Sequence, residues 1–409
     1  MKREVLFVSD APISDELTGS LVSQQIVQSI GTEKIAFLYT PGKELLASGL
    51  ARVHTVEPEM VLVKPRERVP TGWGRALASL FGFMMALSLE TWWRWRWKIV
   101  LKRAFAGRVR WGWIVLQGQT ALVMAEIVRD SLKIPVVVHV WDHIDWWTKS
   151  NSLPPFLRRY YRRKFQRVLE RADFVVGPSP EFVKRFAGGR EESAMHLVFS
   201  RDPGQEKTQI TRDPKFWLIG FAGQMYAEAE VNSLLSALDK VNWRINDRPV
   251  HLLCVGRGHT KLVERVPRGH GRFPGWLGQD EMETLLAGCD LLYCPYPMSA
   301  DFRDIVETSF PSKLVNYMSS GRPILFHGGA SSAPAKWLGH EPFFHLLSTL
   351  DEHDIIAMLQ KSLDETVLEN GLHREFSLLN DEFSTTTFKQ RVLEIRRKLT
   401  AEAGEVSIP

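Results

Sequence analysis

Cysteine is scarce in this chain: three occur among 409 residues, and no Cys-x-x-Cys pair is present. Cys254, Cys289 and Cys294 lie in or beside apolar, strand-like runs. This pattern excludes a disulfide framework and a cysteine-based zinc site. It predicts reduced, buried thiols in a cytosolic protein.

Long hydrophobic runs are also lacking. The longest, at 76–89, is shorter than the ~20 residues that a membrane-spanning helix needs. At the N-terminus, the apolar residues 5–8 are followed at once by Ser9 and Asp10, which is typical of a first β-strand and not of a signal peptide. The sequence therefore predicts neither a spanning helix nor a cleaved leader.

Finger, RNP and KH signatures of nucleic-acid-binding proteins are absent too, so no nucleic-acid partner is expected. The formal net charge of +5 nevertheless suits an anionic partner, such as a nucleotide, a phospholipid surface or a lipid-linked acceptor. A length of 409 residues with 44% hydrophobic residues predicts two or more domains, each with a core of its own.

Strand-like and helix-like segments alternate along both halves of the chain, which predicts α/β domains with doubly wound parallel sheets. The expected strands are 4–8, 34–39, 113–117, 134–140, 172–177, 217–221, 251–255, 291–294 and 324–326. The expected helices are 18–30, 121–132, 156–171, 180–186, 230–242, 282–287, 354–363 and 386–399. A polar stretch at 201–214 is interpreted as a linker. We therefore expect an N-terminal domain at 1–204, a second domain at 205–385, and a last helix with its tail at 386–409.

The most informative segment is FPSKLVNYMSSGRPIL, at residues 310–325. Ser312 and Lys313 open a short helical stretch, Gly321 can end it, and a strand follows. A helix start that carries free backbone N–H groups and a lysine is an anion site. An ordinary helix with a Gly/Pro boundary is the alternative.

This segment resembles the donor-site motif of GT-B glycosyltransferases of family four, which reads roughly as an acidic residue followed by FPSKLxEYMAxGxPV. Further segments resemble the same family in order: IGFAG at 219–223, CVGRG at 254–258, FPGW at 273–276 and LLAGCDLLYC at 285–294. The resemblance implies a GT-B fold, in which two Rossmann-like domains face a central cleft and the last helix crosses back to the N-terminal domain. It also implies hexosyltransferase-like transfer from a nucleotide sugar, with retention of the anomeric configuration.

In that family the loop and helix grip the diphosphate and ribose of the donor. The residues that we expect to bind the donor are Gly19, Gly223, Gln224, Arg257, Trp276, Thr308, Ser312, Lys313, Leu314 and Asn316. No Asp-x-Asp motif is present to hold a metal. We therefore expect helix amides, Lys313 and Arg257 to neutralise the diphosphate, with no metal and no other cofactor.

Three of these positions depart from the family pattern. Thr308 and Asn316 stand where the family has acidic residues, and Gln224 stands where it has an arginine. Asn316 can still bond a ribose hydroxyl, whereas Thr308 offers no carboxylate to the sugar. Two alternatives to a transferase therefore stay open: a GT-B sugar-nucleotide epimerase, and a non-catalytic GT-B subunit that binds a partner enzyme.

Acid–base candidates gather where the predicted strand 134–140 ends. His139, Asp142 and His143 lie at its carboxyl end, the edge at which parallel α/β sheets bind ligands. In the resembling family this position reads roughly THD, with the histidine near the reacting centre. We therefore predict a catalytic acceptor site here, although a purely structural role stays open, especially for His139.

A segment rich in tryptophan and cations is unusual even within the resemblance. The residues that we expect to meet a membrane are Trp92, Trp93, Arg94, Trp95, Arg96, Trp97 and Lys98. Tryptophan and arginine together suit the bilayer interface. The alternative is that the tryptophans pack in the domain while the cations form a solvated face.

These expectations combine into one hypothesis. The chain would be a glycosyltransferase of polysaccharide biosynthesis, cytoplasmic and peripheral on the inner face of the plasma membrane. Its partners would be a nucleotide-sugar donor, an anionic membrane surface, and a lipid-linked or cell-surface glycan acceptor.

Overall fold

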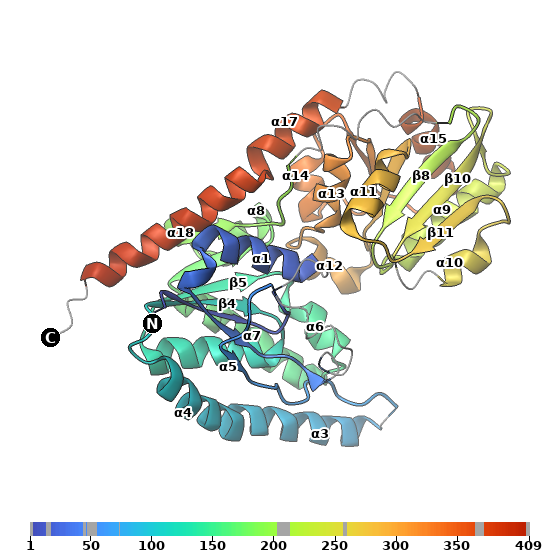
Figure 1. Ribbon diagram of the computed structural model, residues 1–409. Coiled ribbons are helices and arrows are strands. Elements are labelled where there is room, and N and C mark those ends of the chain that lie inside the picture. Colours follow the sequence, from blue (N-terminus) through green and yellow to red (C-terminus); the bar gives the residue numbers. More distant parts are fainter. Residues whose placement is uncertain are drawn as a thin grey trace. The chain divides into compact units, whose positions relative to one another are not determined.

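The computed structural model (Figure 1) describes residues 3–13, 18–43, 46, 55–72, 74–202, 213–256, 260–364 and 372–405. The chain divides into two compact units. One comprises Met1–Val198 with Phe388–Pro409, and the other comprises Phe199–Thr387. Most of the expected linker falls outside the described residues.

The first unit is built on a parallel sheet with the strand order β3-β2-β1-β4-β5-β6-β7. Its strands are β1 (Val5–Ser9), β2 (Ile35–Tyr39), β3 (Met60–Val61), β4 (Trp111–Leu116), β5 (Val136–Val140), β6 (Phe174–Gly177) and β7 (Ala194–His196). Strands β1, β2, β4, β5 and β6 are buried along their whole length, which explains why they read as nearly continuous apolar runs. Because all strands run the same way, their carboxyl ends share one edge of the sheet.

Helices surround this sheet. They are α1 (Thr18–Ile30), α3 (Arg75–Ser88), α4 (Arg94–Phe105), α5 (Gly118–Ile127), α6 (Ile144–Ser150), α7 (Pro155–Arg171), α8 (Pro180–Phe186) and the long α18 (Thr385–Glu405). Helix α5 is buried on every side, as its apolar sequence requires. From Phe388 onward α18 belongs to the first unit, where Arg396 donates two hydrogen bonds of 2.6 and 2.8 Å to Glu4.

Helices α3 and α4 form one continuous run, joined by the π-helical turn η3 (Leu89–Trp93) and visible along one side of the first unit in Figure 1. The run spans Arg75–Phe105, which is 31 residues, with a mean hydropathy of 1.2 in its most apolar window. It is therefore long and apolar enough to cross a membrane, by length and composition alone. The apolar stretch 76–89 was too short to suggest this, because the helix continues through the tryptophan-rich segment.

The second unit contains a parallel sheet with the order β11-β10-β8-β12-β13-β14, to which the short β9 adds an antiparallel pairing with β10. Its strands are β8 (Trp217–Ala222), β9 (Arg244–Ile245), β10 (Arg248–Val255), β11 (Gly271–Gly275), β12 (Leu291–Pro295), β13 (Ile324–His327) and β14 (Phe344–Leu347). Its helices are α9 (Glu228–Lys240), α10 (Thr260–Arg265), α11 (Gln279–Ala287), α12 (Arg303–Val306), α13 (Lys313–Ser319), α14 (Ala333–Leu338), α15 (Glu352–Ser362) and α17 (Leu372–Glu382). The prediction of two α/β units with parallel sheets is confirmed.

All three cysteines are free and buried, as the sequence indicated. Cys289 packs so closely on β8 that a Cβ added to Gly220 would lie 2.6 Å from its sulfur. Glycine at this strand position therefore allows close contact between β8 and the turn after α11.

Candidate functional site

The second unit holds a buried, unpaired ammonium group at the carboxyl end of β8. Lys313 opens α13, and its Nζ lies 4.8 Å from the ring centroid of Phe221 and 5.0 Å from that of Tyr226. Although the residue as a whole is only partly covered, Nζ is buried and donates no hydrogen bond within the part of the chain that the structure describes. Burial lowers the pKa of Lys313 below its ordinary value. Two aromatic faces stabilise a cation only in part, so the group still needs an anion.

Gly223 leaves space beside this ammonium. Its φ of +98° is one that residues with side chains rarely adopt, and a Cβ placed there would lie 3.9 Å from Lys313 Nζ. Tyr317 fixes the turn, because its hydroxyl accepts a 2.8 Å hydrogen bond from the Ala222 N–H and donates to the Tyr293 carbonyl. The sequence analysis missed Tyr226 and Tyr317, whose roles depend on contacts across the unit.

The amides of α13 contribute less than expected. The N–H of Leu314 donates to the Pro311 carbonyl at 3.0 Å, and the next N–H, of Val315, donates to the Ser312 carbonyl. A tight first turn therefore already bonds the Leu314 N–H, so the prediction that this amide binds phosphate is wrong, whereas the predicted role of Ser312 stays a prediction. The side chain of Ser312 makes no helix-capping bond. Binding of a phosphate at this site would therefore depend more on the Lys313 ammonium than on the helix amides.

Two of the divergent positions are already engaged. Asn316 Oδ1 accepts a 3.1 Å hydrogen bond from Gln279, which also donates to Glu283. Thr308 is 1% exposed, and its hydroxyl donates to the Asp304 carbonyl at 2.7 Å. The Thr308 hydroxyl therefore bonds to the backbone of its own segment, and threonine offers no carboxylate to a sugar at this position.

The remaining donor candidates are spread over several elements. Gln224 is exposed directly after Gly223, and Trp276 follows β11 with 53% exposure. Gly19 lies in the first turn of α1, in the other unit. Arg257 lies outside the described residues, so its predicted role stays a prediction.

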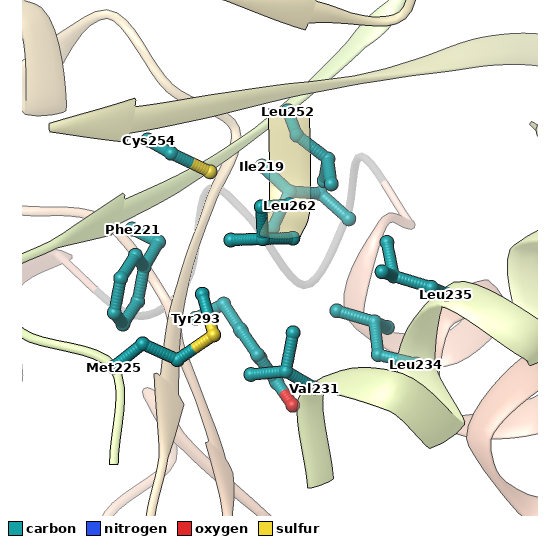
Figure 2. A pocket seen from close by; sticks show the side chains of 10 residues that line it. All are labelled: Ile219, Phe221, Met225, Val231, Leu234, Leu235, Leu252, Cys254, Leu262 and Tyr293. Carbon is teal, nitrogen blue, oxygen red and sulfur yellow. The ribbon is translucent and has the colours of Figure 1, made fainter. Parts of the chain in front are cut away.

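A small cavity lies next to this site but differs from it in chemistry. Figure 2 shows its lining, in which side chains from β8, the following turn, α9, β10, α10 and β12 converge, among them Phe221, Met225 and Cys254. Its volume is about 20 Å³, enough for one water molecule and far too small for a nucleotide. The lining is apolar, so we interpret the cavity as a packing gap in the core.

In the first unit, Asp142 follows β5 and is the acid–base candidate that the structure leaves available. It is partly covered, and no hydrogen bond to it occurs among the described residues. Burial raises the pKa of Asp142 to about 6. A carboxylate with such a pKa can exchange a proton near neutral pH.

The two histidines predicted beside it have structural surroundings. His139 is fully buried between Trp113 and Trp141, and burial lowers its pKa to about 3, so its ring is neutral at pH 7. His143 is 4% exposed and caps α6 by accepting a hydrogen bond from the Asp145 N–H. The structure therefore does not support the expected acid–base role of either imidazole.

A buried ionic group near the same edge was missed by the sequence analysis. Lys64 Nζ lies 2.6 Å from Asp10 and 3.2 Å from Glu67, and Glu67 accepts a hydrogen bond from the Thr120 N–H. Burial opposes the charge of Lys64, but the two carboxylates outweigh it and raise its pKa. Lys64 and Glu67 share one segment, but Asp10 and Thr120 come from distant parts of the chain, so no local pattern could have linked the whole group.

The tryptophan-rich segment divides between core and surface. Trp92 and Trp95 are 53% and 56% exposed, whereas Trp97 is 2% exposed and belongs to the core. Trp93 packs against that core, and Arg94 donates to the buried Glu126. The prediction that Trp97 meets a membrane is wrong, because the helix turns it toward the sheet. Arg96 and Lys98 are exposed.

A segment of the second unit matches the model of a known protein family. Residues 217–336 match the model of the family "Glycosyl transferases group 1". This segment contains Gly223 and Lys313. The chain has the GT-B fold, and this segment of its second unit is similar to group 1 glycosyl transferases. The chain matches none of the curated proteins with which it was compared.

Solved structures share the whole GT-B fold at low sequence identity. Anabaena HepE in complex with UDP-glucose is 16% identical, with a TM-score of 0.61 over 96% of this chain and 99% of HepE. WaaG, a glycosyltransferase involved in lipopolysaccharide biosynthesis, is 12% identical, with a TM-score of 0.56 over 96% and 99%. A putative UDP-N-acetylglucosamine 2-epimerase from Listeria monocytogenes is 10% identical, with a TM-score of 0.56 over 100% and 98%. Because transferases and an epimerase share it, this fold alone does not separate the two reactions.

Proposed function

We propose that this GT-B protein is a glycosyltransferase that uses a nucleotide-sugar donor, retains the anomeric configuration and needs no metal. The observation that supports the proposal best is the buried Lys313 ammonium beside Gly223, which has no anionic partner among the described residues. In the reaction, the bond between the anomeric carbon and the diphosphate breaks, and a bond to the acceptor oxygen forms. Lys313 would stabilise the negative charge that develops on the departing diphosphate.

Lys313→Ala is expected to weaken nucleoside-diphosphate binding by about 1–3 kcal/mol, the scale of a hydrogen bond to a charged group. Titration calorimetry in excess EDTA measures the effect, with UDP-glucose tested first because HepE was solved with it. Because burial lowers the lysine pKa, affinity should also fall as the pH rises through that lowered value toward the ordinary one near 10.5.

Exposed Lys336 on α14 offers a matched control for this experiment: Lys336→Ala removes one cation from the same unit and should leave affinity unchanged. Equal affinity of the Lys313→Ala variant and the wild type, with melting temperatures preserved, would falsify the donor assignment. Binding that requires manganese or magnesium would instead indicate a metal-held diphosphate.

Asp142→Asn is expected to lower kcat/KM by about a hundredfold, the lower range for a general acid or base. In the wild type, kcat/KM should rise as the pH passes about 6, because the carboxylate must be ionised to accept the acceptor proton. The variant should lose this limb while its nucleotide affinity stays unchanged. A pH–rate profile with the same limb in both proteins would remove Asp142 from the mechanism.

A non-catalytic GT-B subunit is the second candidate function. Two observations favour this function: Asn316 already accepts a hydrogen bond from Gln279, and the Thr308 hydroxyl donates to the Asp304 carbonyl. Both residues stand where the resembling family has acidic side chains. Nucleotide binding without sugar turnover on a panel of UDP, GDP, CMP, ADP and TDP sugars would support it over the transferase.

We propose that the acceptor is a lipid-linked or cell-surface glycan and that the reaction is part of polysaccharide biosynthesis. We also propose that the protein is cytoplasmic and peripheral on the inner face of the plasma membrane. The support is the exposed aromatic and cationic surface of the first unit. Transfer of label from the donor into a lipid-extractable product tests the acceptor class; label found only in small soluble sugars would contradict it.

A further inference from the structure

The helical run Arg75–Phe105 carries a continuous apolar face that none of the described residues of the first unit covers. This apolar face consists of Leu77, Leu80, Phe83, Met84, Leu87, Trp92 and Trp95, each between 44% and 61% exposed. Most successive members are three residues apart, and the longer step from Leu87 to Trp92 passes through the π-helical turn, which has more residues per turn, so the set lies along one side of the helices. The ring centroids of Trp92 and Trp95 lie 5.4 Å apart. Contiguous apolar surface of this kind marks a binding face.

The opposite side of the same run is fastened to the domain. A Cβ added to Gly82 would lie 3.0 Å from Leu157 and 3.3 Å from Pro154, so α3 lies close to the start of α7. Farther along, Leu89, Trp97, Leu101 and Phe105 are buried in the core. Crossing a bilayer would require all of these side chains to leave the sheet. A helix that is anchored along its length lies in the plane of an interface instead.

The charges around the apolar face are of one sign. Its exposed charged neighbours on the run are Arg75, Arg96, Lys98, Lys102 and Arg103. The acidic residue of the run, Glu90, turns inward and accepts hydrogen bonds from the buried Lys164. Exposed tryptophans bordered by cations match the headgroup region of an anionic bilayer. A second copy of this chain, related by a two-fold axis, would bring like charges together.

We propose that the apolar face of α3 and α4 inserts into the interface of an anionic bilayer, with the helices lying parallel to the membrane plane and not spanning it. Leu77, Leu80, Met84 and Trp95 enter the boundary of headgroups and acyl chains. Arg96 and Lys98 bind lipid phosphates. This inference specifies the membrane contact of the proposed transferase and does not depend on Lys313, so the two can fail separately.

The test is sedimentation of the full chain with vesicles of phosphatidylcholine alone and of phosphatidylcholine mixed with phosphatidylglycerol. We expect pelleting with the mixed vesicles that weakens as salt rises. Replacing both Leu80 and Met84 by serine should lower vesicle affinity roughly tenfold or more, since two buried apolar contacts are lost. The melting temperature and nucleotide affinity should stay unchanged.

Val263→Ser combined with Leu350→Ser is the matched control, because these residues are 50% and 45% exposed in the second unit. Arg96→Gln with Lys98→Gln should remove the preference for the anionic vesicles. Three results would overturn the proposal: no pelleting with either vesicle, retention in membranes after alkaline carbonate extraction, or a dimer in sedimentation velocity that the Leu80/Met84 variant dissociates. The second indicates a spanning helix and the third a second copy of the chain.

Discussion

Replacing Trp97 by alanine should lower the free energy of unfolding by about 3–5 kcal/mol, the usual cost of truncating a large core side chain. The residue is 2% exposed, and its ring centroid lies 5.4 Å from that of Trp93. Leu101 and Phe105 belong to the same core cluster. Equilibrium urea unfolding, followed by far-ultraviolet circular dichroism, measures the change.

Trp95→Ala is the matched control, since it removes an identical side chain two residues away. With 56% of Trp95 exposed, the expected loss is within about 0.5 kcal/mol. Similar losses in the two variants would mean that the run is rotated about its axis relative to the structure. Such a rotation would also remove the apolar face.

The division between these two tryptophans shows what the sequence could not predict. The inward residues Leu89, Trp93, Trp97, Leu101 and Phe105 recur every four positions. In a straight α-helix, four-residue steps drift around the axis by about 40° each. The π-helical turn η3 has more residues per turn and offsets part of this drift. The sequence analysis expected membrane contact from the residue types in 92–98, and these do not distinguish the buried Trp97 from the exposed Trp95.

Elsewhere the fold could be predicted because its signals are local. Short apolar runs rich in β-branched residues, such as Val136–Val140, favour strands that are buried on both faces. Each expected strand is present with shifted ends, whereas the strands β3, β7, β9, β11 and β14 were not expected. The donor loop was likewise predictable from the string around Lys313. Its surroundings were not, because Phe221 and Tyr226 reach Lys313 from β8 and the following turn.

The histidines after β5 show the same limit for the candidate site. From the sequence alone, His139, Asp142 and His143 are equally good candidates for an acid–base role, because each lies near the end of the same predicted strand. Burial between tryptophans makes His139 a core residue, and a bond from the Asp145 N–H makes His143 a helix cap. Both effects depend on which neighbours the backbone brings close, so only the structure separates them from Asp142.

Replacing Lys164 by methionine should also destabilise the first unit by about 3–5 kcal/mol. Lys164 is 3% exposed, and its Nζ lies 2.5 and 2.6 Å from the two carboxylate oxygens of Glu90 and 3.2 Å from Glu126. Methionine preserves most of the side-chain volume but leaves two covered carboxylates with Arg94 as their remaining cation. Removing one member of a buried charge cluster has this cost because the other charges stay desolvated.

The control lies on the same helix. Arg171 and Asp130 form a comparable pair at the surface, with side chains 46% and 38% exposed, so Arg171→Met should cost no more than about 1 kcal/mol. Adding Glu90→Gln to Lys164→Met should recover part of the loss, because one uncompensated charge is removed. Urea unfolding compares the four proteins. A small effect of Lys164→Met would show that η3 is only weakly tied to α7. The anchoring of the helical run would then rest on the apolar contacts of Leu89, Trp97, Leu101 and Phe105 and not on the buried charges.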